Sequence, residues 1–227
     1  ELDVPLNIHI AETKNEINSI KEKYNSSPIE LLNEINLLER PILGAHCVYI
    51  NDKDLELMKE NNVGVAYNPN SNMKLGSGIA PINKMLKKGI KVGIGTDGVS
   101  SNNNLDLIEE ARIGSYLQKV NNLDPTILNI NDLLKMLTVN GANILNLNHL
   151  GQLKPDFTAD LIMIDINDNP AFYPHHNNLS NLFYGNNGKS VKNVIINGEI
   201  IMRNKEIKTV DTDKILYKTE KISKKLT

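Results

Sequence analysis

Residues 91–104, KVGIGTDGVSSNNN, have the pattern of a buried strand that leads into a turn and then a helix. The stretch begins with a short apolar run, which is followed by one carboxylate, Asp97, between a threonine and a glycine. A helical pattern begins at Leu105. An α/β protein presents catalytic or metal-binding groups in this way, at the carboxyl end of a buried strand. Taken alone, the stretch fits an ordinary strand-to-helix turn better, with Asp97 capping a helix or fixing an Asx turn. The rest of the chain therefore has to decide between the two interpretations.

The segments before this stretch repeat the alternation of strand and helix. Apolar runs predict strands at 5–10, 41–47, 63–67 and 90–94. Helical patterns predict helices at 15–23, 52–61 and 81–88. A further helix is predicted from Ser27-Pro28 onward, and its apolar face consists of Leu31, Leu32, Ile35 and Leu38. Such alternation at short intervals is typical of a parallel βα array. The polar run NPNSN at 68–72 is expected to end the third strand in a turn, and 73–78 to form a loop.

The pattern changes near residue 150. Helices are expected at 105–120, 131–137 and 141–147. A strand is then expected at 159–164. Residues 191–196 and 199–203 are expected to form a hairpin around Asn197-Gly198, and a closing helix is predicted over 212–226. The four βα units form either a small open sheet or the second half of a barrel.

Composition excludes several classes of protein. The 227 residues include 40% hydrophobic residues, enough for a core, and carry a formal net charge of −2, which gives no basic field for nucleic acid. The apolar runs are far too short to span a membrane, and the first ten residues lack the pattern of a signal peptide. The single cysteine supplies neither a disulfide framework nor a cysteine metal site, which fits a reducing cytoplasm.

The residues capable of chemistry follow the predicted strands. His9 ends the first strand with Glu12 three residues later, His46 ends the second and Asp97 ends the fourth. In a βα barrel the active site lies at this end of the strands, and His and Asp are ligands of zinc or iron. Each residue also has a structural interpretation, as a core histidine or a helix-terminal acid. Four such groups at the same end of successive strands favour a shared site.

The remaining candidates are assigned structural roles. His149, His175 and His176 fall in predicted loops or the tail and are expected to be surface or packing residues. Cys47 is expected to be a small buried hydrophobe and not a nucleophile.

Five motifs carry a resemblance to a known family. They are HIAET (9–13), GAHCVYI (44–50), YNPNSNMKLGSGIAP (67–81), GIGTDGVSSNNNLDL (93–107) and GQLKPDFTADLIMID (151–165). Together they resemble the amidohydrolase superfamily, and within it the 5-methylthioadenosine/S-adenosylhomocysteine deaminases. The resemblance implies an α/β fold in which residues 1–150 form the second half, strands five to eight, of a (β/α)8 TIM-type barrel. Residues 151–227 would form part of a small β-sandwich domain and a terminal helix.

The resemblance also implies an activity and a role for each site residue. The activity is hydrolytic deamination of an adenine nucleoside by attack of metal-bound hydroxide on C6, with zinc, or alternatively iron, as the one divalent metal. His9 and Asp97 would be metal ligands, His46 would steer the attacking water, and Asp97 would take its proton. Glu12 would contact the purine and shuttle the proton to it. Glu12 and Asp97 would therefore both also be substrate-binding residues. The expected partner is a small-molecule nucleoside, with self-association open and with neither nucleic acid nor membrane.

Three departures from the family pattern accompany this resemblance. The His-x-His pair that the family carries on strand one is absent, so residues 1–227 alone are expected to be inactive. Tyr67 and Tyr49 stand where the family often has histidine, and both are expected near the site mouth, where they would alter substrate preference. The run SNMKLGSGIAP at 71–81 is expected to shape the pocket and is given no chemistry. The alternatives are another amidohydrolase, of the guanine deaminase or aromatic chlorohydrolase type, or a non-catalytic module.

Overall fold

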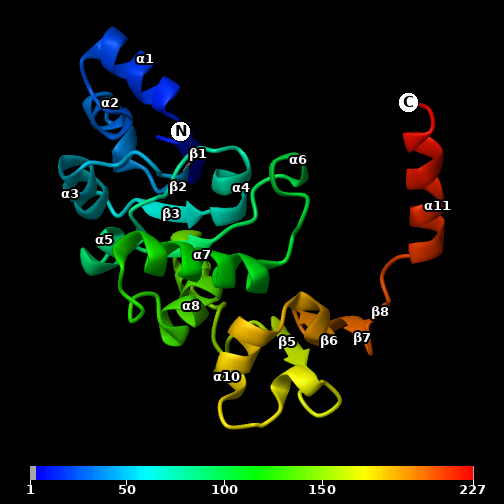
Figure 1. Ribbon diagram of the computed structural model, residues 1–227. Coiled ribbons are helices and arrows are strands. Elements are labelled where there is room, and N and C mark those ends of the chain that lie inside the picture. Colours follow the sequence, from blue (N-terminus) through cyan, green and yellow to red (C-terminus); the bar gives the residue numbers. More distant parts are fainter. Residues whose placement is uncertain (1–3, 227) are drawn as a thin grey trace.

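The computed structural model describes residues 4–226, and its first part is built on a parallel sheet. Four strands follow one another in the order β1-β2-β3-β4: β1 (Leu6–Ile10), β2 (Ile42–His46), β3 (Gly64–Tyr67) and β4 (Val92–Ile94). Figure 1 shows this sheet in the blue-to-green part of the chain, with helices around it. All four carboxyl ends therefore lie at one edge of the sheet, as the sequence predicted.

Helices connect and follow these strands. They are α1 (Lys14–Tyr24), α2 (Pro28–Glu34), the 3-10 turn η1 (Leu37–Glu39), α3 (Asp52–Glu60), α4 (Pro69–Lys74), α5 (Ile82–Lys87), α6 (Val99–Asn102), α7 (Leu107–Asn122), α8 (Ile130–Leu137) and α9 (Val139–Ile144). Local chemistry explains where several begin. The Ser27 side chain accepts from the backbone of Glu30, whose side chain accepts in return, and Pro28 occupies the first turn of α2. Asn51 and Asp54 form the same reciprocal cap on α3.

The core of this part is aliphatic and lies between the sheet and its helices. It includes Ile10, Leu55, Val65, Val92 and Leu133, each at most 1% exposed. Gly114 lets α7 approach β3 closely, because a Cβ there would lie 2.7 Å from Cε1 of Tyr67. The same approach brings α7 against the start of α4.

An antiparallel sheet forms the second part of the molecule. Its order is β5-β6-β7-β8, with β5 (Leu161–Ile164), β6 (Val191–Ile196), β7 (Glu199–Arg203) and β8 (Glu206–Ile207). Asn197 and Gly198 have φ of 50° and 80°, which is the backbone conformation of a primed hairpin turn. The predicted hairpin is therefore confirmed. The short elements η2 (Pro170–Phe172), α10 (Asn178–Ser180), η3 (Asn181–Gly185) and η4 (Gly188–Ser190) link β5 to β6.

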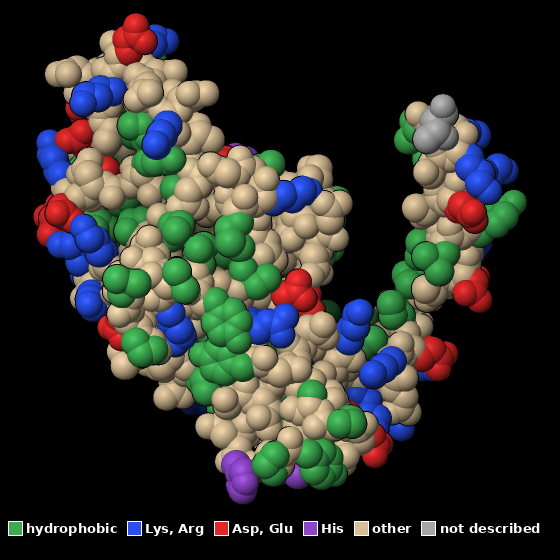
Figure 2. Space-filling model, in the orientation of Figure 1, with side chains coloured by type: hydrophobic (Ala, Val, Ile, Leu, Met, Phe, Trp, Pro, Cys, Tyr) green, Lys and Arg blue, Asp and Glu red, His purple; other side chains and the backbone are tan. Residues whose placement is uncertain are grey.

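The chain closes with α11 (Thr212–Ser223), which Figure 1 shows standing apart from both sheets. Every residue of this helix is exposed, including Ile215 and Ile222. On the face shown in Figure 2, basic and acidic side chains are interspersed, in keeping with the small net charge. Among residues 4–226, none of the helices has the length and apolar character needed to cross a bilayer.

Three local predictions were wrong. Residues 69–74 form α4, not a turn and loop, because Pro69 sits in the first helical turn and the N–H of Asn72 donates to the Asn68 carbonyl. Ile35 does not join the apolar face of α2: it is the C-cap residue and is 60% exposed. The helix predicted over 141–147 instead spans α9, 139–144.

Candidate active site

The carboxyl edge of the parallel sheet brings together the side chains that the sequence singled out. His9 on β1 is in register with Ala45, and Ile10 is in register with His46 at the end of β2. The imidazole rings of His9 and His46 stack, with centroids 5.4 Å apart and planes at 25°. Strand pairing thus places two imidazoles side by side, and His46 is buried while His9 is exposed at the edge strand.

Asp97 completes a cluster of metal-type donors. One ligand atom from each of His9, His46 and Asp97 lies within 4.8 Å of the others. Two imidazoles and a carboxylate are a donor set suited to zinc or iron. Glu12 lies beside the cluster, because its Oε2 is 3.7 Å from Nε2 of His46.

The backbone leaves three of the four strands, β1, β2 and β4, in an unusual conformation at this edge. Ala11, His46 and Asp97 have φ of 53°, 72° and 58°, in the left-handed region that non-glycine residues rarely adopt. Strained backbone of this kind concentrates at functional sites, where it aims side chains.

The Asp97 carboxylate is held by two serine hydroxyls. Ser71 Oγ donates to Oδ2 at 2.6 Å and Ser101 Oγ donates to the same oxygen at 2.7 Å. Burial by itself raises the pKa of Asp97, but these hydrogen bonds and the nearby backbone outweigh it and lower that pKa to about 2. Asp97 is therefore a carboxylate at neutral pH, ready to bind a cation.

His46 and Glu12 are each held by one further side chain. Nδ1 of His46 lies 2.8 Å from Oδ1 of Asn72. Ser77 Oγ donates to Oε1 of Glu12 at 3.0 Å. In each residue the other polar atom stays outside these contacts. These atoms, Nε2 of His46 and Oε2 of Glu12, face each other.

The residues predicted to be structural lie where expected. His149, His175 and His176 are exposed, outside the donor cluster. Cys47 is fully buried, and burial raises the pKa of its thiol to about 12, which excludes it as a nucleophile near neutral pH.

The two tyrosines differ from one another. Tyr67 was predicted at the site mouth, and this is wrong: its ring is 0% exposed and packs against α7, with its hydroxyl 3.4 Å from the Gly114 carbonyl. The reason is that Tyr67 is the last residue of β3 and alternation turns its side chain to the helix face. Tyr49 does lie beside the site, because its hydroxyl donates to the Ser77 carbonyl at 2.7 Å.

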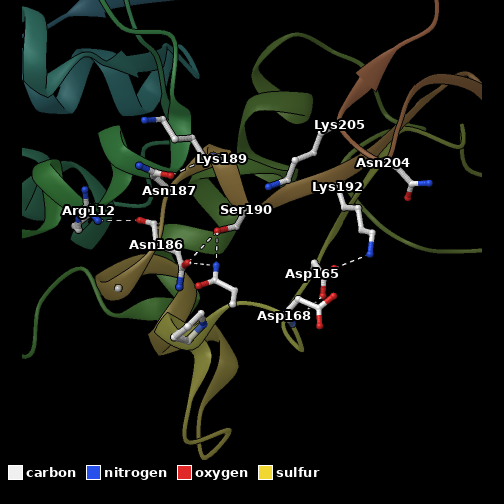
Figure 3. A pocket seen from close by; sticks show the side chains of 13 residues that line it. Arg112, Asp165, Asp168, Asn186, Asn187, Lys189, Ser190, Lys192, Asn204 and Lys205 are labelled. Atoms are coloured by element: carbon white, nitrogen blue, oxygen red, sulfur yellow. Dashed lines mark hydrogen bonds and ion pairs between the residues drawn. The ribbon is translucent and has the colours of Figure 1, made fainter.

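The cavity that Figure 3 shows, of about 460 Å³, lies elsewhere in the molecule. It is lined by Arg112 of α7 and by residues of the antiparallel part, including Asp165 and Lys192, and by none of the four site residues. Three of its charged groups are engaged internally: Lys192 pairs with Asp165 at 2.6 Å, and Arg112 donates to the Asn186 carbonyl.

Sequence reasoning missed the side chains that support the cluster, namely Ser71, Asn72, Ser77 and Ser101. Their signal was present, since three of the four lie in the SNMKLGSGIAP run that was singled out without a chemical assignment. Only the fold shows that these residues reach the strand ends.

Comparison with known proteins agrees with the fold. The model of the amidohydrolase family matches residues 1–201. A 5-methylthioadenosine/S-adenosylhomocysteine deaminase of Halothermothrix orenii is 56% identical over 225 residues, which is 99% of this chain and 52% of that protein. The protein of the same name from Dictyoglomus thermophilum is 45% identical, over 97% of this chain and 52% of its own length. The chain thus spans about half the length of the curated relatives it matches.

Solved structures give the same result. An adenosine deaminase from Xanthomonas campestris with bound zinc superposes with a TM-score of 0.94 at 28% identity, covering 98% of this chain and 51% of that one. The atrazine chlorohydrolase of Arthrobacter aurescens, complexed with zinc, has a TM-score of 0.87 at 24% identity over 96% and 48% of the two chains, which shows the shared fold. From the family match over residues 1–201 and these relatives, the chain belongs to the amidohydrolase family.

Proposed function

We propose that this chain carries part of the active site of a metal-dependent hydrolytic deaminase of adenine nucleosides. The substrates are 5′-methylthioadenosine and S-adenosylhomocysteine, and the products are the inosine analogue and ammonia. The observation that carries the proposal is the cluster of His9, His46 and Asp97 donor atoms within 4.8 Å, with Glu12 beside it. The names of the relatives at 56% and 45% identity support this substrate class.

The proposal includes a division of the chain into two domains. Residues 1–150 supply strands five to eight of a (β/α)8 barrel, a proposal supported by four parallel strands with their chemistry at one edge. Residues 151–227 supply part of a small β-sandwich and the terminal helix, supported by the antiparallel sheet.

The donor set fits a divalent metal. His9 and Asp97 would hold it, and two stacked imidazoles beside a carboxylate of low pKa suit zinc, the metal bound in the adenosine deaminase neighbour. When bound, zinc supplies a water acidic enough to ionise near neutral pH. The chain has no His-x-His pair, so its residues 1–227 supply fewer ligands than a catalytic zinc site needs. Residues 1–227 alone are expected to release no ammonia.

The chain's own residues supply the proton transfers. The Asp97 carboxylate, ionised at neutral pH, accepts the proton of the attacking water. His46 orients that water through Nε2, which faces the cluster. Glu12 delivers a proton from Oε2 to the ring nitrogen next to C6, while Ser77 holds the other oxygen. Glu12 therefore starts the reaction protonated. Asp97 passes the proton it took from water to the amino nitrogen, the bond from C6 to that nitrogen breaks, and ammonia leaves. The remaining hydroxyl proton on C6 returns to Glu12, which leaves a carbonyl at C6 and both carboxyl groups as they began.

The test is ammonia release by the full-length, zinc-loaded protein with each nucleoside, together with the change in ultraviolet spectrum from an adenine to a hypoxanthine chromophore. Turnover of either nucleoside supports the proposal. If neither reacts while guanine or a chlorinated triazine does, the family holds and the substrate assignment fails.

A further inference from the structure

The segment Ser71 to Ser77, here called the 71–77 turn, contacts three of the four site residues. Ser71 Oγ donates to Asp97, Asn72 Oδ1 lies at Nδ1 of His46, and Ser77 Oγ donates to Glu12, at 2.6, 2.8 and 3.0 Å. Ser71 and Asn72 lie in the middle of α4, and Ser77 lies in the loop after it. One short segment thus reaches residues on three different strands' carboxyl ends.

The three contacting residues of the 71–77 turn are buried and hydrogen-bonded. Ser71 and Asn72 are 0% exposed and Ser77 is 5% exposed. The N–H of Ser77 donates to the Asn72 carbonyl at 2.8 Å, which closes the segment on itself. Tyr49 donates to the Ser77 carbonyl at 2.7 Å, which ties the segment to the loop after β2. A rigid support of this kind transmits its own position to the groups it touches.

The start of α4 is anchored from the opposite side. The buried carboxylate of Glu110 on α7 accepts from the N–H of Asn70 at 3.2 Å. Because Gly114 lets α7 approach this region closely, α7 and α4 form one packed unit beneath the site.

The contact between Asn72 and His46 affects the tautomer of the His46 imidazole as well as its position. A neutral imidazole carries its proton on one nitrogen only, and a partner at the other nitrogen selects which. Oδ1 of Asn72 only accepts, so Nδ1 of His46 must donate to it and Nε2 must hold the lone pair. Nε2 is the atom 3.7 Å from Oε2 of Glu12.

We propose that Asn72 is a positioning residue that fixes His46 as the Nδ1–H tautomer, leaving an accepting Nε2 directed at the reacting water. Ser71 and Ser77 orient Asp97 and Glu12 from the same turn. This rests on the proposed function for its kinetic consequence, but the tautomer is a property of the protein without substrate. A water that donates to Nε2 has its oxygen lone pairs turned away from His46, toward the electrophilic carbon.

The direct test is nitrogen-15 NMR of the full-length protein labelled at histidine, near pH 8.5, about two units above the ordinary pKa of imidazole. Long-range proton–nitrogen correlations distinguish a protonated from a bare ring nitrogen, and loss of signals in His46→Gln assigns the residue. The expected result is a protonated Nδ1 and a bare Nε2 at His46. A protonated Nε2 overturns the proposal, whether or not the protein deaminates nucleosides.

Variants at Asn72 give the second readout. Asn72→Leu removes the acceptor at similar volume, and kcat is expected to fall about 10–100-fold with KM changed less than about 3-fold, as for removal of a supporting hydrogen bond. Asn72→Asp keeps an accepting oxygen and replaces Nδ2, which has no hydrogen-bond partner among residues 4–226, with a second, charged oxygen, so Nδ1 of His46 should stay protonated and kcat should fall less than in Asn72→Leu. Asn122→Leu, at an exposed asparagine of α7, is the matched control.

The outcomes are distinguishable. A parental tautomer and kcat in folded Asn72→Leu overturn the positioning role. Absence of nucleoside turnover by the parent protein overturns the proposed function and leaves the NMR result to decide the tautomer.

Discussion

The parallel and antiparallel parts of this molecule both contain carboxylates next to nitrogen-bearing side chains, but they arrange them differently. At the parallel edge, Asp97 is held by two hydroxyls and faces two imidazoles. In the antiparallel part, Asp165 lines a cavity of about 460 Å³ and its charge is paired with Lys192. Asp165 thus faces the cavity already paired with a cation, whereas Asp97 faces groups that can share a metal with it. Several metal-type donor atoms that face one point indicate a site better than the volume of a cavity does.

The largest expected effect separates the two carboxylates. Asp97→Asn removes a proposed metal ligand and proton acceptor, so kcat/KM of the full-length protein should fall by at least about 10³-fold. Asp165→Asn, the matched change in the antiparallel part, should alter kcat/KM by less than about 2-fold. Steady-state ammonia release measures both. Equal effects of the two changes would erase the distinction between the two regions.

The two histidine environments should also differ. His46→Asn removes the buried imidazole between Asn72 and Glu12 and is expected to lower kcat by about 10²–10³-fold, as for loss of a group that orients or transfers protons. His149→Asn changes an exposed imidazole outside the cluster and should leave kcat unchanged. Zinc content, measured by atomic absorption, should remain above half of the parent value in both variants. A His46→Asn protein of parental activity contradicts the assignment.

A smaller effect distinguishes the two tyrosines. Tyr67→Phe removes a hydroxyl that lies 3.3 Å from Nε2 of Gln118, with an expected loss of about 1 kcal/mol in the free energy of unfolding and no change in KM. Tyr49→Phe removes the hydrogen bond to the Ser77 carbonyl and should change kcat by about 2–5-fold, because Ser77 holds Glu12. Urea unfolding and steady-state kinetics check the pair. A KM change in Tyr67→Phe alone would restore the prediction that Tyr67 faces substrate.

The smallest effect is expected in α11. Ile215 is 47% exposed, so Ile215→Ala should change the free energy of unfolding of residues 1–227 by less than about 0.5 kcal/mol. Urea denaturation followed by circular dichroism measures this. A loss above about 1 kcal/mol would mean that the helix packs on the body in solution.

The sequence was most informative where periodicity and burial act together. The apolar runs ending in His46 and Asp97 predicted strands, and parallel pairing then required their side chains to meet at one edge. It failed where a tertiary contact outweighs local preference. The run NPNSN has turn chemistry, yet Glu110, forty residues away, accepts from the backbone of Asn70 and helps to hold the helix.

The supporting shell was beyond the reach of spacing alone. Asn72 and His46 are 26 residues apart, and Ser77 and Glu12 are 65 apart, so no local pattern links them. The orientation of Tyr67 was missed for a similar reason, since its partners on α7, Gly114 and Gln118, are 47 and 51 residues away.

The central claim is that the carboxyl edge of the parallel sheet holds the metal. Diffraction at the zinc absorption edge from crystals of the zinc-loaded, full-length protein tests it most directly. We predict an anomalous peak about 2.0–2.2 Å from an imidazole nitrogen of His9 and from a carboxylate oxygen of Asp97. A peak at Asp165 and Asp168 beside the cavity, with none at His9 and Asp97, would contradict the account.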